Sequence, residues 1–138
     1  MNQLDGRCLC GNVTYSCEGE AMATLLCHCT DCQRQTGTAF SIVVGLPADA
    51  LEVRGDTLAM VKTLGEAHGG ETERNFCSAC GSPIFSLSPA FPAVAWLKAG
   101  TLDDTSWLEP QVEVWGRSAQ PWVEQVEGRP RVETVPGA

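Results

Sequence analysis

The segment Cys27-His-Cys-Thr-Asp-Cys32 places three cysteines within six residues, and Phe76-Cys-Ser-Ala-Cys-Gly81 carries a second close group. A third group, Cys8-Leu-Cys-Gly11, lies near the start of the chain. Zinc binds thiolates at about 2.3 Å in a tetrahedron, so closely spaced cysteines supply adjacent corners without closing a long loop. These groups contain seven of the eight cysteines. They predict a fold built around metal ions.

The cysteine spacing suggests how two zinc sites would share these thiols. Cys77 and Cys80 precede Gly81 in the manner of a zinc knuckle, in which the turn aims backbone N–H groups at sulfur and glycine tolerates left-handed backbone angles. Gly11 follows the first pair in the same way. We therefore expect a closed structural site formed by four thiolates, namely Cys8, Cys10, Cys77 and Cys80.

The remaining thiols, Cys27, Cys29 and Cys32, leave one zinc position for water or substrate, which is typical of a catalytic site. Spacing alone leaves a second partition open, in which Cys32 joins Cys77 and Cys80. An even number of cysteines also permits a disulfide framework, but near-neighbour pairs in a reducing compartment favour metal. In another alternative both metals are structural, with Cys17 or a histidine completing the ligand set of the second zinc. We expect Cys17 to be a buried apolar residue instead.

Length and composition predict one domain that neither spans a membrane nor binds nucleic acid. The chain has 138 residues, of which 43% are apolar, and no run approaches the roughly 20 apolar residues of a membrane helix. Nine basic and seventeen acidic residues give a net charge of -8, which disfavours contact with phosphate backbones. Met1–Arg7 lacks the pattern of a secretory signal, so we expect a cytoplasmic protein.

Short alternating segments and frequent Gly and Pro predict a mainly β fold of antiparallel sheets. We expect a single zinc-binding domain over residues 1–127 and a loose C-terminal tail over residues 128–138, which has few core residues. A short helix is expected over Thr30–Thr36, with Thr30 as its N-cap and Gly37 as its end. The expected strands are 13–17, 40–46, 51–54, 58–63, 72–76, 84–87, 94–99 and 112–115.

The motifs together resemble the glutathione-dependent formaldehyde-activating family over Gly6 to Val123. The resemblance is carried by the three cysteine groups and by Gly37, Phe40, Pro110 and the closing segment Trp115-Gly-Arg-Ser-Ala-Gln-Pro-Trp122. It implies a β-tent of antiparallel sheets around two zinc ions. It implies the same partition, with Cys8, Cys10, Cys77 and Cys80 on the structural zinc and Cys27, Cys29 and Cys32 on the catalytic zinc.

The resemblance also implies a carbon-sulfur lyase that forms or cleaves S-hydroxymethylglutathione from glutathione and formaldehyde. Glu113 departs from the pattern, because relatives often have histidine there. A zinc ion with three thiolates has a net charge of about -1, so it acidifies water less than a site of neutral histidines does. A thiol is therefore the better fourth ligand, and the expected partners are a small thiol and an aldehyde.

Residues around the three-thiol group suggest further roles. His28 is expected to project away from the metal, either as a proton relay at the substrate mouth or as a hydrogen-bonding residue that orients the ligand loop. Asp31 is expected to be a solvated turn residue or a hydrogen-bond acceptor behind the ligands.

Two kinds of larger side chain are candidates for the pocket itself. Arg34 and Arg117 are candidates for binding a substrate carboxylate, although both suit an ordinary surface position. Trp115 and Trp122 are expected in the core or in a pocket wall.

Two other classes of function remain open. A zinc module of the same fold can bind a protein partner without catalysis. A redox or zinc-release protein would use Cys27, Cys29 and Cys32 as oxidisable thiolates.

Overall fold

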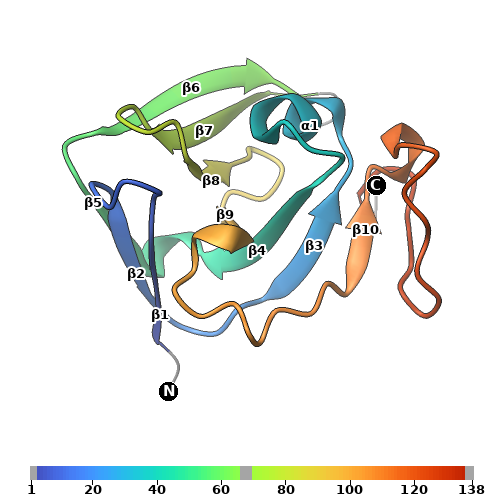
Figure 1. Cartoon of the computed structure of the whole chain (residues 1–138), viewed down its shortest axis with the longest axis horizontal. Helices are drawn as coiled ribbons and strands as arrows, with labels where there is room; N and C mark the ends of the chain where they lie inside the picture. Colours follow the sequence, from blue (N-terminus) through green and yellow to red (C-terminus); the bar gives the residue numbers. More distant parts are fainter. Residues whose placement is uncertain (1–2, 66–69, 136–138) are drawn as a thin grey trace.

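The chain forms two β-sheets and one short helix in a computed structural model that describes residues 3–65 and 70–135 (Figure 1). Met1 and the last three residues of the expected tail, 136–138, lie outside the described residues. The strands are β1 (Gln3–Arg7), β2 (Thr14–Glu18), β3 (Ala23–Cys27), β4 (Ser41–Pro47), β5 (Leu51–Arg54), β6 (Leu58–Leu64), β7 (Glu71–Cys77), β8 (Pro83–Leu87), β9 (Val94–Lys98) and β10 (Val112–Val114), and the helix is α1 (Thr30–Thr36). Single 3₁₀ turns cover Ala48–Ala50, Ala99–Thr101 and Gly116–Ser118.

The described residues divide between a small sheet of order β1-β2-β5 and a large sheet of order β10-β3-β4-β9-β8-β7-β6. Figure 1 shows the small sheet at the left and β3, β4 and β10 at the right. The mainly β fold, of the β-tent type, is as expected. One pair is not antiparallel, because β10 runs parallel to β3. A parallel pair needs a long crossover, and here all of the chain between β3 and β10 supplies it.

The core lies where the two sheets meet. Tyr15 and Cys17 of β2 are buried there with Leu46 of β4, Ile84 of β8 and Leu97 of β9. The alternation along each strand sends these side chains to one face. Burial of each large aliphatic side chain contributes about 1.5–3 kcal/mol. Cys17 is therefore a core residue, as the sequence predicts.

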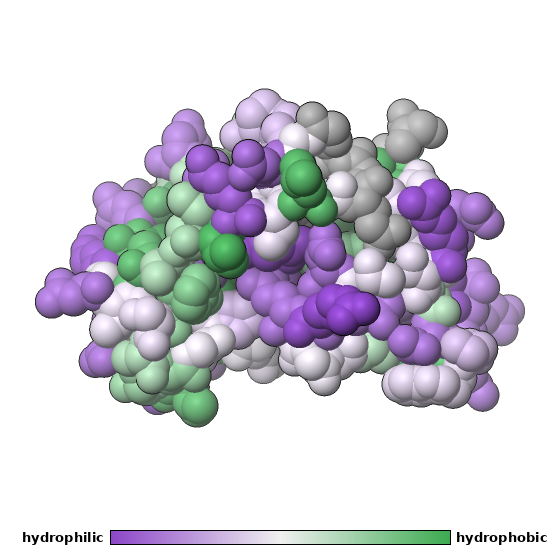
Figure 2. Space-filling view, turned by 90° about the horizontal axis from the view of Figure 1, so that it is seen from above, coloured by the Kyte–Doolittle hydropathy of each residue, from purple (hydrophilic) through white to green (hydrophobic). Residues whose placement is uncertain are grey.

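Strand β6 forms an edge of the large sheet and carries exposed apolar residues. Met60, Val61 and Leu64 have exposed fractions of 44%, 47% and 79%. Figure 2, which looks onto this side of the molecule, shows hydrophobic residues gathered toward its left and hydrophilic ones across its middle and right. Lys62 is also exposed on β6, and a charge on an edge strand disfavours pairing with another chain.

The helix occupies the predicted residues but begins differently. Its N-cap is Cys29, not Thr30, and the Cys29 sulfur accepts a hydrogen bond from the Cys32 N–H. Gly37 ends the helix in a left-handed conformation, with its N–H bonded to the Gln33 carbonyl. Cys29 can cap the helix because sulfur is an acceptor too, although it is a weaker one than the usual hydroxyl.

The segment expected to be a loose tail is instead attached to β10. The Glu113 N–H donates to the Pro130 carbonyl at 2.9 Å, and the Val132 N–H donates to the Glu113 carbonyl at 2.9 Å. The Trp115 N–H donates to the Thr134 carbonyl at 2.7 Å. The polar composition was misleading, because this segment is held by backbone pairing and charge instead of apolar burial. No helix among the described residues is long and apolar enough to cross a membrane.

Candidate metal centres

Four thiols meet where the two sheets are joined. Cys8 follows β1 and Cys10 lies in the turn to β2, while Cys77 ends β7 and Cys80 lies in the turn to β8. Their sulfur atoms all lie within 4.8 Å of one another. This four-thiol cluster therefore links the β1–β2 hairpin of the small sheet to the β7–β8 hairpin of the large one.

The sulfur spacing suits a tetrahedral zinc ion. Zinc–sulfur bonds of about 2.3 Å at tetrahedral angles place neighbouring sulfurs about 3.8 Å apart. Cys10 Sγ lies 3.6 Å from Cys8 Sγ and 3.8 Å from Cys77 Sγ. The donor set and its spacing therefore fit zinc without rearrangement.

Both turns of the four-thiol cluster depend on glycine. Gly11 and Gly81 have φ angles of 83° and 81°, which residues with a Cβ rarely adopt. The Gly81 N–H donates to the Cys77 carbonyl at 2.7 Å, and the Val13 N–H donates to Cys8 Sγ at 3.3 Å. The turns thus bring each pair of sulfurs to one side, and backbone N–H groups donate to the sulfurs of Cys8, Cys77 and Cys80, as the knuckle pattern predicts.

Hydrogen bonds favour the thiolate form of two of these cysteines. The Ser82 hydroxyl, 3.2 Å from Cys80 Sγ, and the Ser82 backbone lower the pKa of Cys80 to about 5. The Thr57 hydroxyl, 3.2 Å from Cys77 Sγ, lowers the pKa of Cys77. Metal binding requires thiolate, so these groups prepare the site for a cation.

Three further thiols meet at the junction of β3 and α1. Cys27 ends β3, Cys29 caps the helix and Cys32 lies in its first turn, and the three sulfurs lie within 4.8 Å of one another. The pKa of Cys32 is lowered, first by hydrogen bonds from the other two thiols and then by nearby positive charge. This three-thiol cluster suits a cation with one position left for another ligand.

The structure brings the seven thiols together in the partition that the sequence favours. Cys32 does not join Cys77 and Cys80, and Cys17 belongs to neither cluster. All eight cysteines lie within the described residues and are free thiols, so the disulfide framework is not formed.

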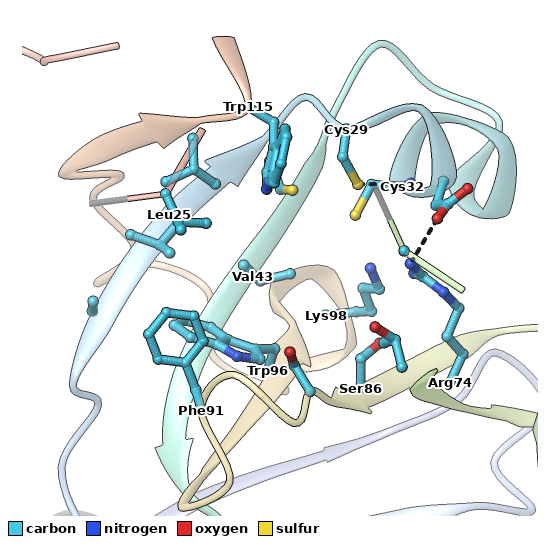
Figure 3. A pocket seen from close by; sticks show the side chains of 18 of the residues that line it. Leu25, Cys29, Cys32, Val43, Arg74, Ser86, Phe91, Trp96, Lys98 and Trp115 are labelled. Carbon is cyan, nitrogen blue, oxygen red and sulfur yellow. Dashed lines mark hydrogen bonds and ion pairs between the residues drawn. The ribbon is translucent and has the colours of Figure 1, made fainter. Parts of the chain in front are cut away.

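A pocket of about 330 Å³ opens beside the three-thiol cluster (Figure 3). Leu25, Phe91 and Trp96 lie toward one side of it, and Lys98 and Arg74 lie toward the other (Figure 3). Ala23, Val43, Val112, Val114 and Trp115 add apolar surface, and Asp31, Thr72, Ser86 and Ser88 add polar groups. The cluster is thus one end of a cavity large enough for a small substrate.

Two basic residues of the pocket were not predicted from the sequence. Lys98 is buried, and its ammonium donates to Ser41 Oγ at 2.8 Å. Burial lowers the pKa of Lys98, while the charge of the Cys32 thiolate opposes that shift. Lys98 lies two residues after Trp96 and therefore on the same face of β9. The signal available in the sequence for this pocket residue was a lysine in an otherwise apolar strand.

Arg74 is the second unpredicted basic residue, on β7. Its guanidinium donates to Thr63 Oγ1 at 2.8 Å and to Gln35 Oε1 at 2.9 Å, and lies 3.9 Å from Asp31. Asp31 is therefore in an ion pair at the pocket, a role that its expected solvated position did not include. Nothing in the local sequence pattern distinguishes Arg74 from a surface residue.

His28 is fully buried and does not line the pocket. Its Nε2 lies 2.7 Å from Glu113 Oε1, and its backbone N–H donates to the Val114 carbonyl at 3.0 Å. The position agrees with a residue that orients the ligand loop. It does not agree with a proton relay at the substrate mouth, because no described surface of the pocket includes the imidazole.

Glu113 is the centre of a buried charge network. Arg129 Nε donates to its Oε2 at 3.0 Å, and Arg131 Nε donates to its Oε1 at 2.8 Å. Burial raises the pKa of Glu113, but the hydrogen bonds from His28, Arg129 and Arg131 outweigh it and leave that pKa lowered. The C-terminal segment is thereby linked through one carboxylate to the loop that carries Cys27 and Cys29.

The other candidates from the sequence divide between the pocket and the surface. Trp115 is buried and lines the pocket, with a left-handed φ of 58° that is costly for a bulky side chain. Trp122 is 71% exposed, so it is neither core nor pocket wall. Arg34 is exposed on α1, outside the pocket, and Arg117 stacks on the Trp115 ring at 4.8 Å.

A family model described as glutathione-dependent formaldehyde-activating enzyme matches residues 3–118, which include both thiol clusters. The chain belongs to this family. The family's range ends before Arg129 and Arg131, so the two arginines of the charge network lie outside it.

Relatives named for glutathione-dependent formaldehyde activation are moderately similar. One from Aspergillus flavus is 28% identical over 109 residues, covering 75% of this chain and 56% of the relative. One from Talaromyces marneffei is 30% identical over 88 residues, covering 62% of this chain and 46% of the relative. The chain thus spans about half the length of the curated relatives it matches. A Rhodobacter sphaeroides protein of known structure shares the fold, with a TM-score of 0.60, 18% identity and coverage of 93% of this chain and 99% of that one.

Proposed function

We propose that the protein is a zinc-dependent carbon-sulfur lyase that forms or cleaves a thiol–aldehyde adduct, of which S-hydroxymethylglutathione is one example. The observation that carries this proposal is the three-thiol cluster at the end of a pocket of about 330 Å³. A cluster that held zinc only for structure would have no need of a substrate-sized cavity beside it.

The two clusters have different proposed roles. Cys8, Cys10, Cys77 and Cys80 would hold a structural zinc, and Cys27, Cys29 and Cys32 a catalytic one, giving two ions per chain. His28 is assigned a positioning role through Glu113 and does not touch the substrate. When bound, the catalytic zinc supplies a positive centre that holds a substrate thiol as its thiolate.

The protein residues then have to place the aldehyde. The substrate sulfur attacks the carbonyl carbon, the carbon-sulfur bond forms, and the carbonyl electron pair moves to oxygen, which takes up a proton equivalent to the one that the thiol released on binding; cleavage reverses these changes. A lysine ammonium has three donors, and Ser41 uses one at Lys98. We assign another to the aldehyde oxygen. The apolar wall excludes water, which strengthens that hydrogen bond.

Cobalt substitution tests this function directly. The spectrum of the open cobalt site is expected to change when a small thiol is added, and the zinc protein is expected to accelerate adduct formation or breakdown above the uncatalysed rate. Cys29→Ser is the control that removes one sulfur of the three-thiol cluster. An unchanged spectrum with every thiol tried, together with equal rates for wild type and Cys29→Ser, would leave the non-enzymatic interaction module as the better explanation.

The partners and compartment follow from the same observations. A small thiol and an aldehyde are the proposed partners. The net charge of -8 argues against a nucleic-acid partner. Free thiols in both clusters are favoured in a reducing compartment such as the cytoplasm, which is the proposed location.

A further inference from the structure

We infer that this site takes an adduct whose body, the part of the thiol beyond its sulfur atom, is uncharged and apolar. Such an adduct is taken in preference to one of a charged tripeptide such as glutathione. The inference rests on the proposed function, because it concerns the substrate of the same site. It depends on where the charged residues of the pocket lie and on how they are already paired.

The charged residues that line the described part of the pocket lie at its thiol end. Among the described lining residues these are Asp31, Arg74 and Lys98. Beyond them, in Figure 3, lie Leu25, Phe91 and Trp96. The substrate body would therefore extend from the thiol end along an apolar wall.

Among the described lining residues, the charge balance leaves no cation for a substrate carboxylate. Three thiolates and a zinc ion have a net charge of about -1, which the Lys98 ammonium offsets. Arg74 is already engaged by Thr63, Gln35 and the Asp31 carboxylate. A substrate thiolate adds a negative charge, and a carboxylate would add a second one with no free partner among the lining residues that the structure describes. Burial of an unpaired charge is strongly unfavourable.

The shape of the apolar end favours a flat or branched body. The rings of Phe91 and Trp96 meet edge to face at 5.9 Å and 84°, which gives the pocket a rigid aromatic corner. Trp115 also lines the pocket, and its left-handed backbone conformation and its burial fix the position of its ring. Rigid aromatic surface of this kind packs against an aryl or branched alkyl group.

Two unpartnered hydroxyls identify a polar position in the same cavity. Thr72 Oγ1 and Ser86 Oγ are buried, line the pocket and have no hydrogen-bond partner among the described residues. Buried polar atoms are normally bonded, so each indicates room for a ligand atom. The adduct hydroxyl, whose oxygen accepts from Lys98 in the proposed function, is uncharged and can also donate, so it suits this position.

A matched pair of thiols tests the inference. We would compare para-methylbenzyl mercaptan with para-carboxybenzyl mercaptan, each with formaldehyde, and include glutathione. The expected kcat/KM is at least about tenfold higher for the neutral thiol than for the other two. Binding is followed separately by cobalt absorption and by tryptophan fluorescence, since Trp96 and Trp115 line the pocket.

Leu25→Arg provides the reciprocal test, because it places a cation on the apolar wall. It is expected to improve binding of the carboxylate thiol relative to the neutral one by about tenfold or more. Met22→Arg adds the same charge at a residue that is 58% exposed and outside the pocket, so it is expected to leave the ratio unchanged. If circular dichroism shows that Leu25→Arg does not fold, Leu25→Gln replaces it. This variant is expected to reduce the preference for the neutral thiol over the carboxylate thiol.

The possible failures are distinguishable. If glutathione or the carboxylate thiol is preferred, the inference is wrong and the proposed lyase activity stands. If no thiol reacts faster with the protein present, the lyase proposal fails, and the binding ratios alone then decide the substrate preference. Equal binding of all three thiols would overturn the inference.

Discussion

The two thiol clusters differ in what they join. Cys10 and Cys77 are 67 residues apart, so the four-thiol cluster connects two hairpins of different sheets. The three-thiol cluster uses one strand end and the first turn of α1, and it faces a pocket. Closing a long loop constrains the whole chain, whereas closing a short one constrains only itself. We propose that the same ligand type serves folding in the four-thiol cluster and chemistry in the three-thiol cluster.

The largest expected effect separates the clusters by stability. Cys77→Ser should remove a ligand that links the sheets and leave most of the protein unfolded at 37 °C, because zinc-finger sites contribute about 10–16 kcal/mol and a domain has about 5–15 kcal/mol in total. Cys29→Ser should remain folded and lose only the metal of the three-thiol cluster. Thermal unfolding with zinc analysis measures both. Equal losses in melting temperature would show that both sites are structural.

The support behind the three-thiol cluster provides the next test. Glu113→Gln should destabilise the protein by about 3 kcal/mol, the lower end of the cost of breaking a buried ion pair. The lower end applies because Arg129 and Arg131 keep 20% and 16% exposure. Urea unfolding measures the change. The matched control is Glu52→Gln, whose exposed pair with Arg54 should contribute less than about 1 kcal/mol.

The stability difference between wild type and Glu113→Gln is also expected to depend on pH. The pKa of Glu113 in the folded protein is lowered from its ordinary value of 4.5. The ionised carboxylate therefore contributes stability that is fully present above the unfolded pKa and lost as pH falls through the folded one. The stability gap between wild type and Glu113→Gln should be constant near pH 7 and shrink in acid below about pH 4. A gap that does not change with pH would show that the charge of Glu113 is not what stabilises the segment.

Much of this comparison is predictable from sequence, because local spacing determines it. The knuckle glycines, the close cysteine groups and the extent of α1 all depend on neighbours within a few residues, whereas spacing alone left open which group Cys32 joins. Arg74 and the Glu113 network depend on which distant strands lie side by side, and no local pattern contains that. For Lys98 the local signal was a lysine in an otherwise apolar strand, which does not say what the lysine faces. The β10–β3 pairing and the attachment of residues 129–134 were missed for the same reason.

Selective metal removal is expected to have a smaller effect on stability. A mild chelator should take the ion from the three-thiol cluster, whose pocket gives access to it, and lower the melting temperature by only a few degrees, since about 1 kcal/mol corresponds to about 2–8 °C. The ion of the four-thiol cluster should be released only on unfolding. Zinc analysis after dialysis, followed by an indicator titration during unfolding, measures the two releases. Simultaneous release of both ions would contradict the distinction.

The smallest expected effect concerns the charge beside the three-thiol cluster. Lys98→Gln removes a buried cation while keeping a donor for Ser41, so the fold should change little. The positive charge that offsets the thiolates is lost, and thiol binding to the cobalt protein should weaken by about tenfold, or about 1.4 kcal/mol. Lys62→Gln on exposed β6 makes the same change in net charge away from the pocket and should leave binding unaltered. If the two variants weaken thiol binding to the same extent, the overall charge of the protein and not Lys98 attracts the substrate. If only Lys98→Gln is weaker, the difference between the clusters extends beyond their ligands to the charge that the fold places beside them.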